Sequence, residues 1–471
     1  MVEKMFKTCL IFLLSFFWVF LSGCSSNKIQ GASNANNLGE LELNLPVKKY
    51  TLDNGLRLLV VENNKLPIVS YYTFFDVGGR FESREAGTTG ATHFLEHMMF
   101  KGAKKYKSGE FEKIVEGNGG RGNAYTTFDS TVYYESFPSK ILNKIIDLEA
   151  DRMGHLTIET KSFESERLVV KEERKMRYEN SPMGKLYLSM MKAVFKGTPY
   201  GGSVIGDVKD LDSLTQDQIQ EFFKTFYAPN NAIIVVVGDV SGPDVFKQVK
   251  RKYGNLKSNK KLADLKKSLD KVDIYDFKEF KSGERKVFAQ AKDPIFIAAY
   301  PGVKLNDRKA MVYDLLTSML SGGISSYMHQ KYVQAKKPLF SSIGVSNYNL
   351  KNSGVFFIKG DLLPGTSLSK VKRILKKDVK RYCRDDVLTL RELQKTRNNY
   401  LVDYYSSISS NSGLASFLGM REAFFGDYEH YKKELREYSS ISLDEIKKEC
   451  KNIFKPGSEI LLHVWNKNPR K

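Results

Sequence analysis

The chain has 471 residues, of which 41% are hydrophobic, and it carries a formal net charge of +20. This length is enough for two to three packed domains, and four cysteines are too few for a disulfide framework. No nucleic-acid-binding signature accompanies the basic charge. The charge therefore indicates a solvated surface, or attraction to anionic lipid and acidic peptides, and it does not indicate a nucleic-acid partner.

The N-terminus has the features of a targeting segment. Lys4 and Lys7 form a charged start, and a dozen mostly apolar residues, 9–20, follow. This stretch is too short for a comfortable membrane span. The next four residues, Leu21-Ser22-Gly23-Cys24, resemble the bacterial lipoprotein signal, in which the cysteine is lipidated and becomes the first residue of the mature protein.

We therefore expect a lipoprotein signal peptide over residues 1–23, lipidation of Cys24, and a flexible tether over 24–45 that is rich in Ser, Asn and Gly. An ordinary cleaved signal peptide with a cysteine nearby is the alternative. Ser25 resembles the signal that sorts lipoproteins to the outer membrane. The expected location is the bacterial cell envelope, with the protein anchored in the outer membrane and facing the periplasm.

Two histidines with an acid between them form the motif His93-x-x-Glu96-His97. Residues four apart on a helix share one face, so the two imidazoles can bind one metal ion together. Glu96 projects beside them, where it can take a proton from water on the metal. Apolar neighbours favour a helix that ends near Gly102. The alternative is a structural helix, because histidines on apolar helices are usually core residues.

A catalytic zinc site needs a third protein ligand and an open position for water. A helix predicted over residues 162–178 offers four carboxylates, Glu164, Glu166, Glu172 and Glu173. Glu166 and Glu173 are seven residues apart, which is two helical turns, so they lie on one face. The charges of Glu164 and Glu172 are explained by an ion-paired, solvated helix surface, without a role in metal binding.

These motifs resemble those of the pitrilysin or insulinase-like family of zinc metallopeptidases, in its bacterial processing-peptidase branch. The family places a glutamate 76 residues after the second histidine, at the end of an E-R-x-x-x-x-x-E segment. Here these two acids are Glu173 and Glu166. The resemblance implies one zinc ion per chain, held by His93, His97 and Glu173, with Glu96 as the general base. Glu166 is then a second acid of the catalytic site that orients a ligand.

The resemblance covers residues 46–465 and includes a segment that contacts substrate. Residues 122–127 resemble an edge strand with which an extended substrate pairs, so Asn123, Ala124 and Tyr125 are the expected substrate-binding residues. Asn123 can alternatively be a turn residue after Gly122. Other matching segments are the Asn54-Gly55 turn and residues 78–82, 149–153, 199–201 and 227–239.

The second half of the chain repeats the order of the first. Strands are predicted over 295–301 and 354–360, and helices over 307–320 and 367–382. A stretch rich in Lys and Asp, 257–290, is the expected linker. We expect an α+β fold of two homologous halves, 46–256 and 291–471, each a mixed or antiparallel sheet flanked by helices. The resemblance implies a clam-shell-like arrangement with a partner, and a zinc site in the first half only.

The sequence departs from the family at two positions of the second half, and this departure indicates a partner subunit. In the family, the second half or a partner subunit carries an Arg, and a Tyr seven residues later, which bind substrate and stabilise the tetrahedral intermediate. The corresponding residues here are Val333 and Phe340, and neither side chain donates a hydrogen bond. The chain is therefore expected to be the zinc-bearing subunit of a heterodimer whose homologous partner supplies the pair. Lys331, Lys336 or Lys337 is a less favoured substitute.

The predicted function is a lipid-anchored, zinc-dependent endopeptidase that cleaves extended or unfolded peptides. The alternatives are a non-catalytic scaffold subunit and a lipoprotein that binds peptides without cleaving them. Two further cysteines, Cys383 and Cys450, lack zinc-knuckle spacing, and the sequence leaves open whether they pair.

Overall fold

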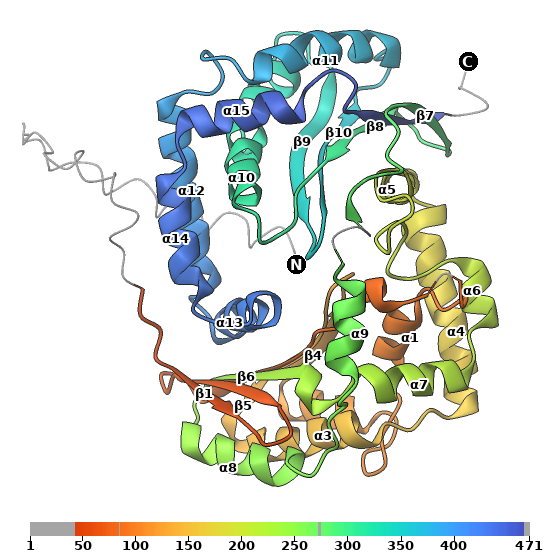
Figure 1. Ribbon diagram of the computed structural model, residues 1–471, viewed down its shortest axis with the longest axis vertical. Helices are drawn as coiled ribbons and strands as arrows, with labels where there is room; N and C mark the ends of the chain where they lie inside the picture. The colour runs from red at the N-terminus through yellow and green to blue at the C-terminus, as the bar shows by residue number, and fades with distance from the viewer. Residues whose placement is uncertain (1–42, 84, 272–274, 466–471) are drawn as a thin grey trace, which may run out of the picture. The chain divides into compact units, whose positions relative to one another are not determined.

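The computed structural model describes residues 43–83, 85–271 and 275–465 (Figure 1). The predicted signal peptide, Cys24 and the tether up to residue 42 lie outside the described residues. The described residues belong to one compact unit. Among them, no helix combines the length and the apolar composition that crossing a membrane requires.

The first sheet is mixed, has six strands in the order β1-β2-β6-β3-β5-β4, and places β4 at one edge. Strands β2 and β6 are parallel and the other neighbours are antiparallel. Every residue of β6 is buried, as expected for a Val/Ile-rich strand in a sheet that is covered on both faces. The strands are β1 (Val47–Thr51), β2 (Arg57–Glu62), β3 (Ile68–Phe75), β4 (Arg121–Thr126), β5 (Thr131–Pro138) and β6 (Ala232–Gly238).

Alternate residues of these strands enter two different cores. Val60, Tyr71 and Val236 pack with the helices of the first half. Their neighbours Leu59 and Tyr72 point to the other face and pack with residues near position 417 of the second half. The helices of the first half are α1 (Ala91–Met98), α2 (Glu110–Val115), α3 (Leu142–His155), α4 (Thr160–Arg174), α5 (Pro182–Val194), α6 (Val208–Ser213), α7 (Gln216–Phe226) and α8 (Gly242–Tyr253). A π-helical turn, η5 (Lys175–Glu179), follows α4.

The second sheet repeats the topology of the first. Its order is β7-β11-β8-β10-β9, with β7 and β11 parallel and the other neighbours antiparallel. This order corresponds strand by strand to β2-β6-β3-β5-β4, so the predicted α+β fold of two homologous halves is confirmed. The strands are β7 (Gly283–Phe288), β8 (Ile295–Pro301), β9 (Phe340–Asn349), β10 (Gly354–Leu362) and β11 (Ile460–Trp465).

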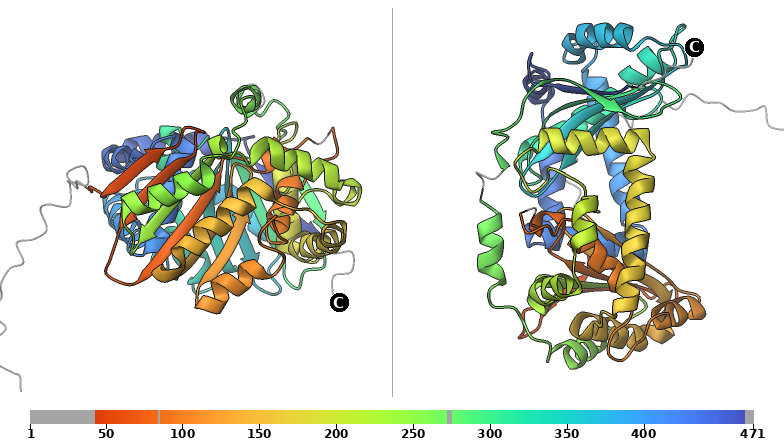
Figure 2. Two further views of the ribbon diagram at one scale, coloured as in Figure 1. Left: turned by 90° about the horizontal axis from the view of Figure 1, so that it is seen from below. Right: turned by 90° about the vertical axis from the view of Figure 1, so that its right-hand side faces the viewer.

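Each half covers one face of the other half's sheet. Helix α13 (Asn411–Phe425) packs on β3 and β6 of the first sheet, and α5 packs on β8 and β11 of the second (Figure 2). Gly419 makes the approach of α13 possible, because a Cβ atom there would lie 2.0 Å from the ring of Phe74. The halves are therefore joined through packed cores.

The segment 257–290, predicted as a linker, contains regular structure. It includes α9 (Leu262–Leu269) and β7, and β7 is a strand of the second sheet. The second half thus starts its sheet before residue 291. Leu262 packs in the first core, and Lys266 of α9 forms a 2.6 Å ion pair with Asp76. Asp270 of the segment forms a 2.8 Å ion pair with Arg80, so a lysine and an aspartate of the segment both contact the first half.

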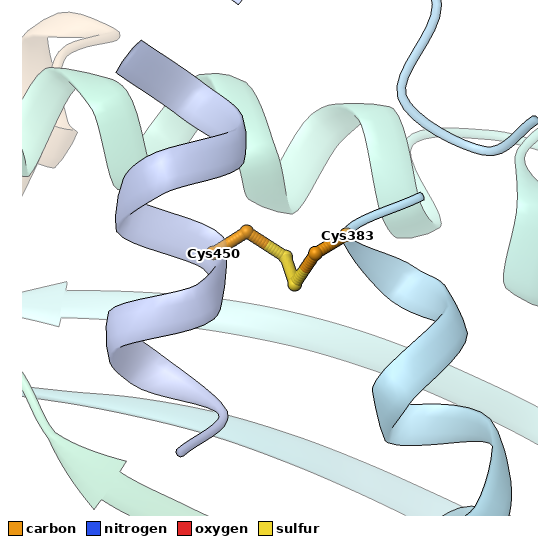
Figure 3. The surroundings of a disulfide bond; sticks show 2 residues. All are labelled: Cys383 and Cys450. Carbon is orange, nitrogen blue, oxygen red and sulfur yellow. A yellow bond between two sulfur atoms is a disulfide. The ribbon is translucent and has the colours of Figure 1, made fainter. Parts of the chain in front are cut away.

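Cys383 and Cys450 form a disulfide in the second half (Figure 3). Both are buried, and the bond joins the end of α11 to α15 across 67 residues of sequence. The sequence had left this pairing open. The helices of the second half, in addition to α13, are α10 (Arg308–Ser321), α11 (Leu368–Tyr382), α12 (Leu390–Ser407), α14 (His430–Ser440) and α15 (Leu443–Ile453).

Candidate active site

Helix α1, which carries the His93–His97 motif, is fixed at its start by a side chain from outside the helix. The carboxylate of Glu82 accepts hydrogen bonds from the backbone N–H groups of Gly90 (2.7 Å) and Thr92 (2.9 Å). It thereby satisfies two of the donors that a helix start leaves free. Gly90 has a φ of 90°, and a Cβ atom there would lie 2.3 Å from the carbonyl oxygen of Ile205. Only glycine fits this position.

The three predicted ligands lie together. Oε2 of Glu173, on α4, is 3.5 Å from Nε2 of His93 and 3.5 Å from Nε2 of His97. One ligand atom from each residue lies within 4.8 Å of the other two. Bonds of about 2.0–2.1 Å to a tetrahedral zinc ion place neighbouring donor atoms roughly 3.3 Å apart, so the two 3.5 Å separations from Glu173 fit zinc. Two imidazoles and one carboxylate are also a known donor set for catalytic zinc.

Burial shifts the pKa values of His93 and Glu96. It lowers the pKa of His93 to about 4, so the imidazole is neutral at pH 7, as a metal ligand must be. Glu96 is buried beside the histidines, and burial raises the pKa of its carboxyl group. A raised pKa makes a carboxylate a better proton acceptor, which is what a general base requires.

Glu166 lies behind the ligands. Its Oε2 is 3.1 Å from Nδ1 of His97, and its Oε1 is 2.7 Å from Nζ of Lys101. Because Nδ1 is the ring nitrogen that faces away from Glu173, Glu166 can hold the ring and fix its tautomer. The contacts of Glu166 with His97 and Lys101 are those that the orienting role implied by the resemblance would require.

The two other glutamates of α4 point elsewhere. Glu164 is exposed and pairs with Arg167 at 2.9 Å, and the Glu172 side chain is 67% exposed and lies 3.4 Å from Lys175. Neither belongs to the histidine cluster. These contacts are the ion-paired surface expected for both residues.

Two side-chain contacts of the site were not predicted from the sequence. Nη2 of Arg177, on η5, forms a 2.8 Å ion pair with Oε1 of Glu173, so only Oε2 is left toward the histidines. The hydroxyl of Thr126, at the end of β4, donates to Oε2 of Glu96. Thr126 lies in the segment 122–127 that was predicted to bind substrate, but its contact with Glu96 was not predicted. No motif included Arg177.

Strand β4 is the edge of the first sheet, as predicted for the substrate-binding strand. Asn123 is exposed, while Ala124 and Tyr125 are half-buried. Oδ1 of Asn123 accepts a hydrogen bond from the backbone N–H of Ala124 at 2.8 Å. Within the described part of the chain, β4 pairs only with β5, so its outer edge can accept a further strand.

In the second half, the two positions where the sequence departs from the family, 333 and 340, carry no side chain that donates a hydrogen bond. Phe340 is buried in the second core against Phe296 and Tyr332. Val333 is partly buried and packs on the same core. Of the lysines weighed as substitutes, Lys331 forms a 2.9 Å ion pair with Asp378. Lys336 and Lys337 are exposed, without an ion pair to the described residues.

Comparison with known proteins places this fold and site in a family. Residues 58–208 match Insulinase (Peptidase family M16), and residues 213–400 match Peptidase M16 inactive domain. The chain is 31% identical over 388 residues to zinc protease PqqE of Helicobacter pylori, covering 81% of this chain and 83% of that protein. The chain therefore belongs to the insulinase (M16) family of peptidases, and the family identified from the sequence is confirmed.

Other similar proteins agree with this. The chain is 25% identical over 412 residues to the uncharacterized zinc protease YmxG of Bacillus subtilis, covering 87% and 96% of the two chains. It is 32% identical over 210 residues, 44% of this chain and 39% of that protein, to a probable mitochondrial-processing peptidase subunit beta of Arabidopsis thaliana. A crystal structure of a protease from Helicobacter pylori matches with a TM-score of 0.80 and 28% identity, covering 89% and 99% of the chains.

Proposed function

We propose that this chain is the catalytic, zinc-bearing subunit of an endopeptidase that cleaves extended peptides. One observation carries the proposal. The His93, His97 and Glu173 cluster and the buried acid Glu96 lie at the end of an open sheet edge, and Thr126 of that edge is hydrogen-bonded to Glu96. The candidate ligands, the candidate base and an open strand edge therefore lie close together, which supports the proposal.

The residues divide the chemistry among them. A zinc ion bound by His93, His97 and Glu173 would polarise the scissile carbonyl and lower the pKa of a water molecule. Glu96 takes the proton of the attacking water and delivers it to the leaving amine. The hydroxyl of Thr126 orients the Glu96 carboxylate for both transfers.

The substrate extends along β4. A peptide added to the outer edge of the sheet pairs with backbone groups of Asn123, Ala124 and Tyr125, which gives affinity with little dependence on sequence. Because Thr126 contacts Glu96, such a peptide runs directly to the base. Pairing of this kind requires an extended backbone, so folded proteins are poor substrates.

A homologous partner subunit completes the site. Phe340 is fixed in the second core and Val333 has no polar group, so neither stabilises a developing oxyanion. An Arg/Tyr pair on a second chain would do so. The similarity to a protein named as a subunit of a processing peptidase supports a two-chain enzyme.

The proposed location is the periplasmic side of a bacterial envelope, with the chain anchored through acylated Cys24. The disulfide between Cys383 and Cys450 supports this, because disulfides persist in the periplasm and are rare in the bacterial cytosol.

The test is zinc content and cleavage of a quenched, unstructured peptide, with the chain alone and with a homologous subunit that carries the Arg/Tyr pair. We expect one zinc per chain, low activity alone, and an increase of about 10²–10³ with the partner, which is the usual worth of an oxyanion donor. Peptide binding without cleavage in both preparations would favour the peptide-binding alternative. Absence of zinc would favour the scaffold.

A further inference from the structure

Helix α11 presents a continuous basic face. The helix has seven basic residues and one acidic residue over Leu368–Tyr382. Val371, Leu375, Asp378 and Tyr382 are buried and form its inner face. The exposed basic residues lie on the opposite side, at the three- and four-residue spacing that makes one face: Lys370, Arg373, Lys376, Lys377, Lys380 and Arg381.

This charge is not neutralised by neighbours. None of those six side chains forms an ion pair with a carboxylate of the described residues. The only acid of the helix, Asp378, points inward and pairs with Lys331 at 2.9 Å. An ordinary solvated helix surface mixes both signs and gains from pairs spaced three or four residues apart. The outer face of α11 is of one sign over its whole length.

Helix α15 extends the same face. A cavity of about 630 Å³ lies between the ends of α11 and α15. Five basic side chains line it, and two of them are paired with carboxylates, Lys447 with Asp385 at 2.5 Å and Arg384 with Asp386 at 3.1 Å. The other three are Lys380, Lys451 and Lys455.

The disulfide makes the two helices one rigid platform. Cys383 follows the last residue of α11, and Cys450 lies on α15 (Figure 3). Cys383 also lines the cavity. The covalent link keeps the basic ends of both helices at a fixed separation. Without this link, repulsion between the basic residues would favour a larger separation of the two helix ends.

The composition of the basic face and the compartment of the protein indicate which class of partner the face binds. No exposed large apolar side chain lies between Ile324 and Leu390 in the described chain, so the face is built for charge attraction at a surface and not for insertion. The disulfide indicates an oxidising compartment outside the cytosol, where membranes are the extensive anionic surface and nucleic acid is scarce.

We propose that the outer face of α11, with the α15 side of the cavity, binds the surface of an anionic phospholipid bilayer, and that the cavity receives a headgroup phosphate. The proposal rests on the proposed envelope location, but it does not depend on peptidase activity. The face would orient the chain on the membrane, which an acyl anchor at Cys24 alone would not do.

The test is sedimentation of the chain with vesicles, using the chain from Ser25 onward so that neither leader nor acyl group contributes. This form retains the whole described unit. Vesicles contain phosphatidylcholine alone or an equal mixture with phosphatidylglycerol. The test variant combines K370E, R373E, K377E and R381E. The matched control combines K247E, K250E, R251E and K257E, four exposed positions on and after α8 with the same change of net charge.

We expect binding to the phosphatidylglycerol vesicles only. A basic residue at an anionic surface is worth about a fivefold change in binding, so the α11 variant should bind at least about a hundredfold more weakly. The α8 variant should stay within about fivefold of the wild type, because charges beyond the screening length contribute little. Zinc content and thermal unfolding should match the wild type in both variants, which shows that the fold is retained.

Equal losses in the two variants would overturn the proposal, because binding would then depend on net charge alone. Failure of the wild type to bind phosphatidylglycerol vesicles would also overturn it. Tighter binding of a short DNA duplex than of the vesicles, lost in the α11 variant, would assign the face to nucleic acid instead. None of these outcomes bears on peptide cleavage, which is measured separately on the same samples.

Discussion

At the scale of single residues, the site depends on which oxygen of Glu173 faces the histidines. Arg177 holds Oε1, so Oε2 alone is directed at the two imidazoles. In R177Q, we expect zinc affinity to fall by about 10–100-fold, as is typical when a group that orients a ligand is lost. Chelator competition measures this affinity.

Lys175 provides the matched control for Arg177. It lies on the same π-helical turn and pairs with Glu172, which is not part of the cluster. K175Q removes the same charge and should bind zinc normally. Equal zinc affinities in R177Q and K175Q would show that Arg177 does not position Glu173.

The sequence predicted part of this site for a clear reason. The spacing of His93, Glu96 and His97 within one helix fixes their relative positions, so local sequence is sufficient. Glu173 required a family resemblance, because a helix rich in glutamate offers several equivalent candidates. The contacts of Thr126 and Arg177 depend on how β4 and η5 pack beside α1, and no local pattern encodes that packing.

At the scale of elements, the disulfide fixes α11 to α15. It closes 67 residues of chain between two buried cysteines. The pair C383S and C450S should lower the free energy of unfolding by about 2–4 kcal/mol, chiefly because the unfolded chain gains freedom. Urea unfolding of the oxidised wild type and the double variant measures the difference. An unchanged midpoint would contradict this account.

A buried charge cluster between β5 and α3 makes stability depend on pH. Arg152 Nη2 lies 2.6 Å from Glu149 and 3.4 Å from Glu135, and all three side chains are buried. Burial, with the negative charge of Glu149, raises the pKa of Glu135 well above its ordinary value. The carboxyl group therefore binds a proton more tightly in the folded chain than in the unfolded chain.

The sign of the effect follows from this shift. A raised folded-state pKa stabilises the fold fully below the unfolded pKa, and the contribution is lost as pH rises through the folded value. E135Q cannot ionise, so its unfolding free energy should fall less between about pH 5 and pH 8 than that of the wild type. R152M should cost about 3–5 kcal/mol, because the buried Glu149 carboxylate loses its partner. Parallel pH profiles of E135Q and wild type would refute this assignment.

Individual helices and strands could be predicted where their pattern is local. The predicted strand over 295–301 matches β8, and the helix over 367–382 matches α11 within one residue. The exchange of α5 and α13 between the halves could not be predicted, because each helix packs on a sheet of the other half and its own sequence does not specify that sheet. Strand β7 was missed because GERKVF is mostly exposed and lacks an apolar alternation.

At the scale of the whole molecule, the proposed anchor is tested through Cys24. Labelled palmitate should enter the wild-type chain in cells and should not enter C24S, and the C24S chain should leave the membrane fraction in high salt. One acyl chain gives only marginal binding, whereas the several chains of a bacterial lipoprotein hold firmly. High salt is needed because the basic face of α11 would retain an unacylated chain at low ionic strength. Unlabelled wild-type protein in the soluble periplasm would contradict the anchor.

The central claim is that Glu96 is the base of a zinc peptidase whose metal is held by His93, His97 and Glu173. The most direct measurement compares zinc content and peptide cleavage in wild type, E96Q and E173Q, each with the same partner subunit. We predict one zinc per chain in the wild type and in E96Q, cleavage by the wild type alone, and strongly reduced zinc in E173Q. Cleavage by E96Q at the wild-type rate, or normal zinc content in E173Q, would contradict the account.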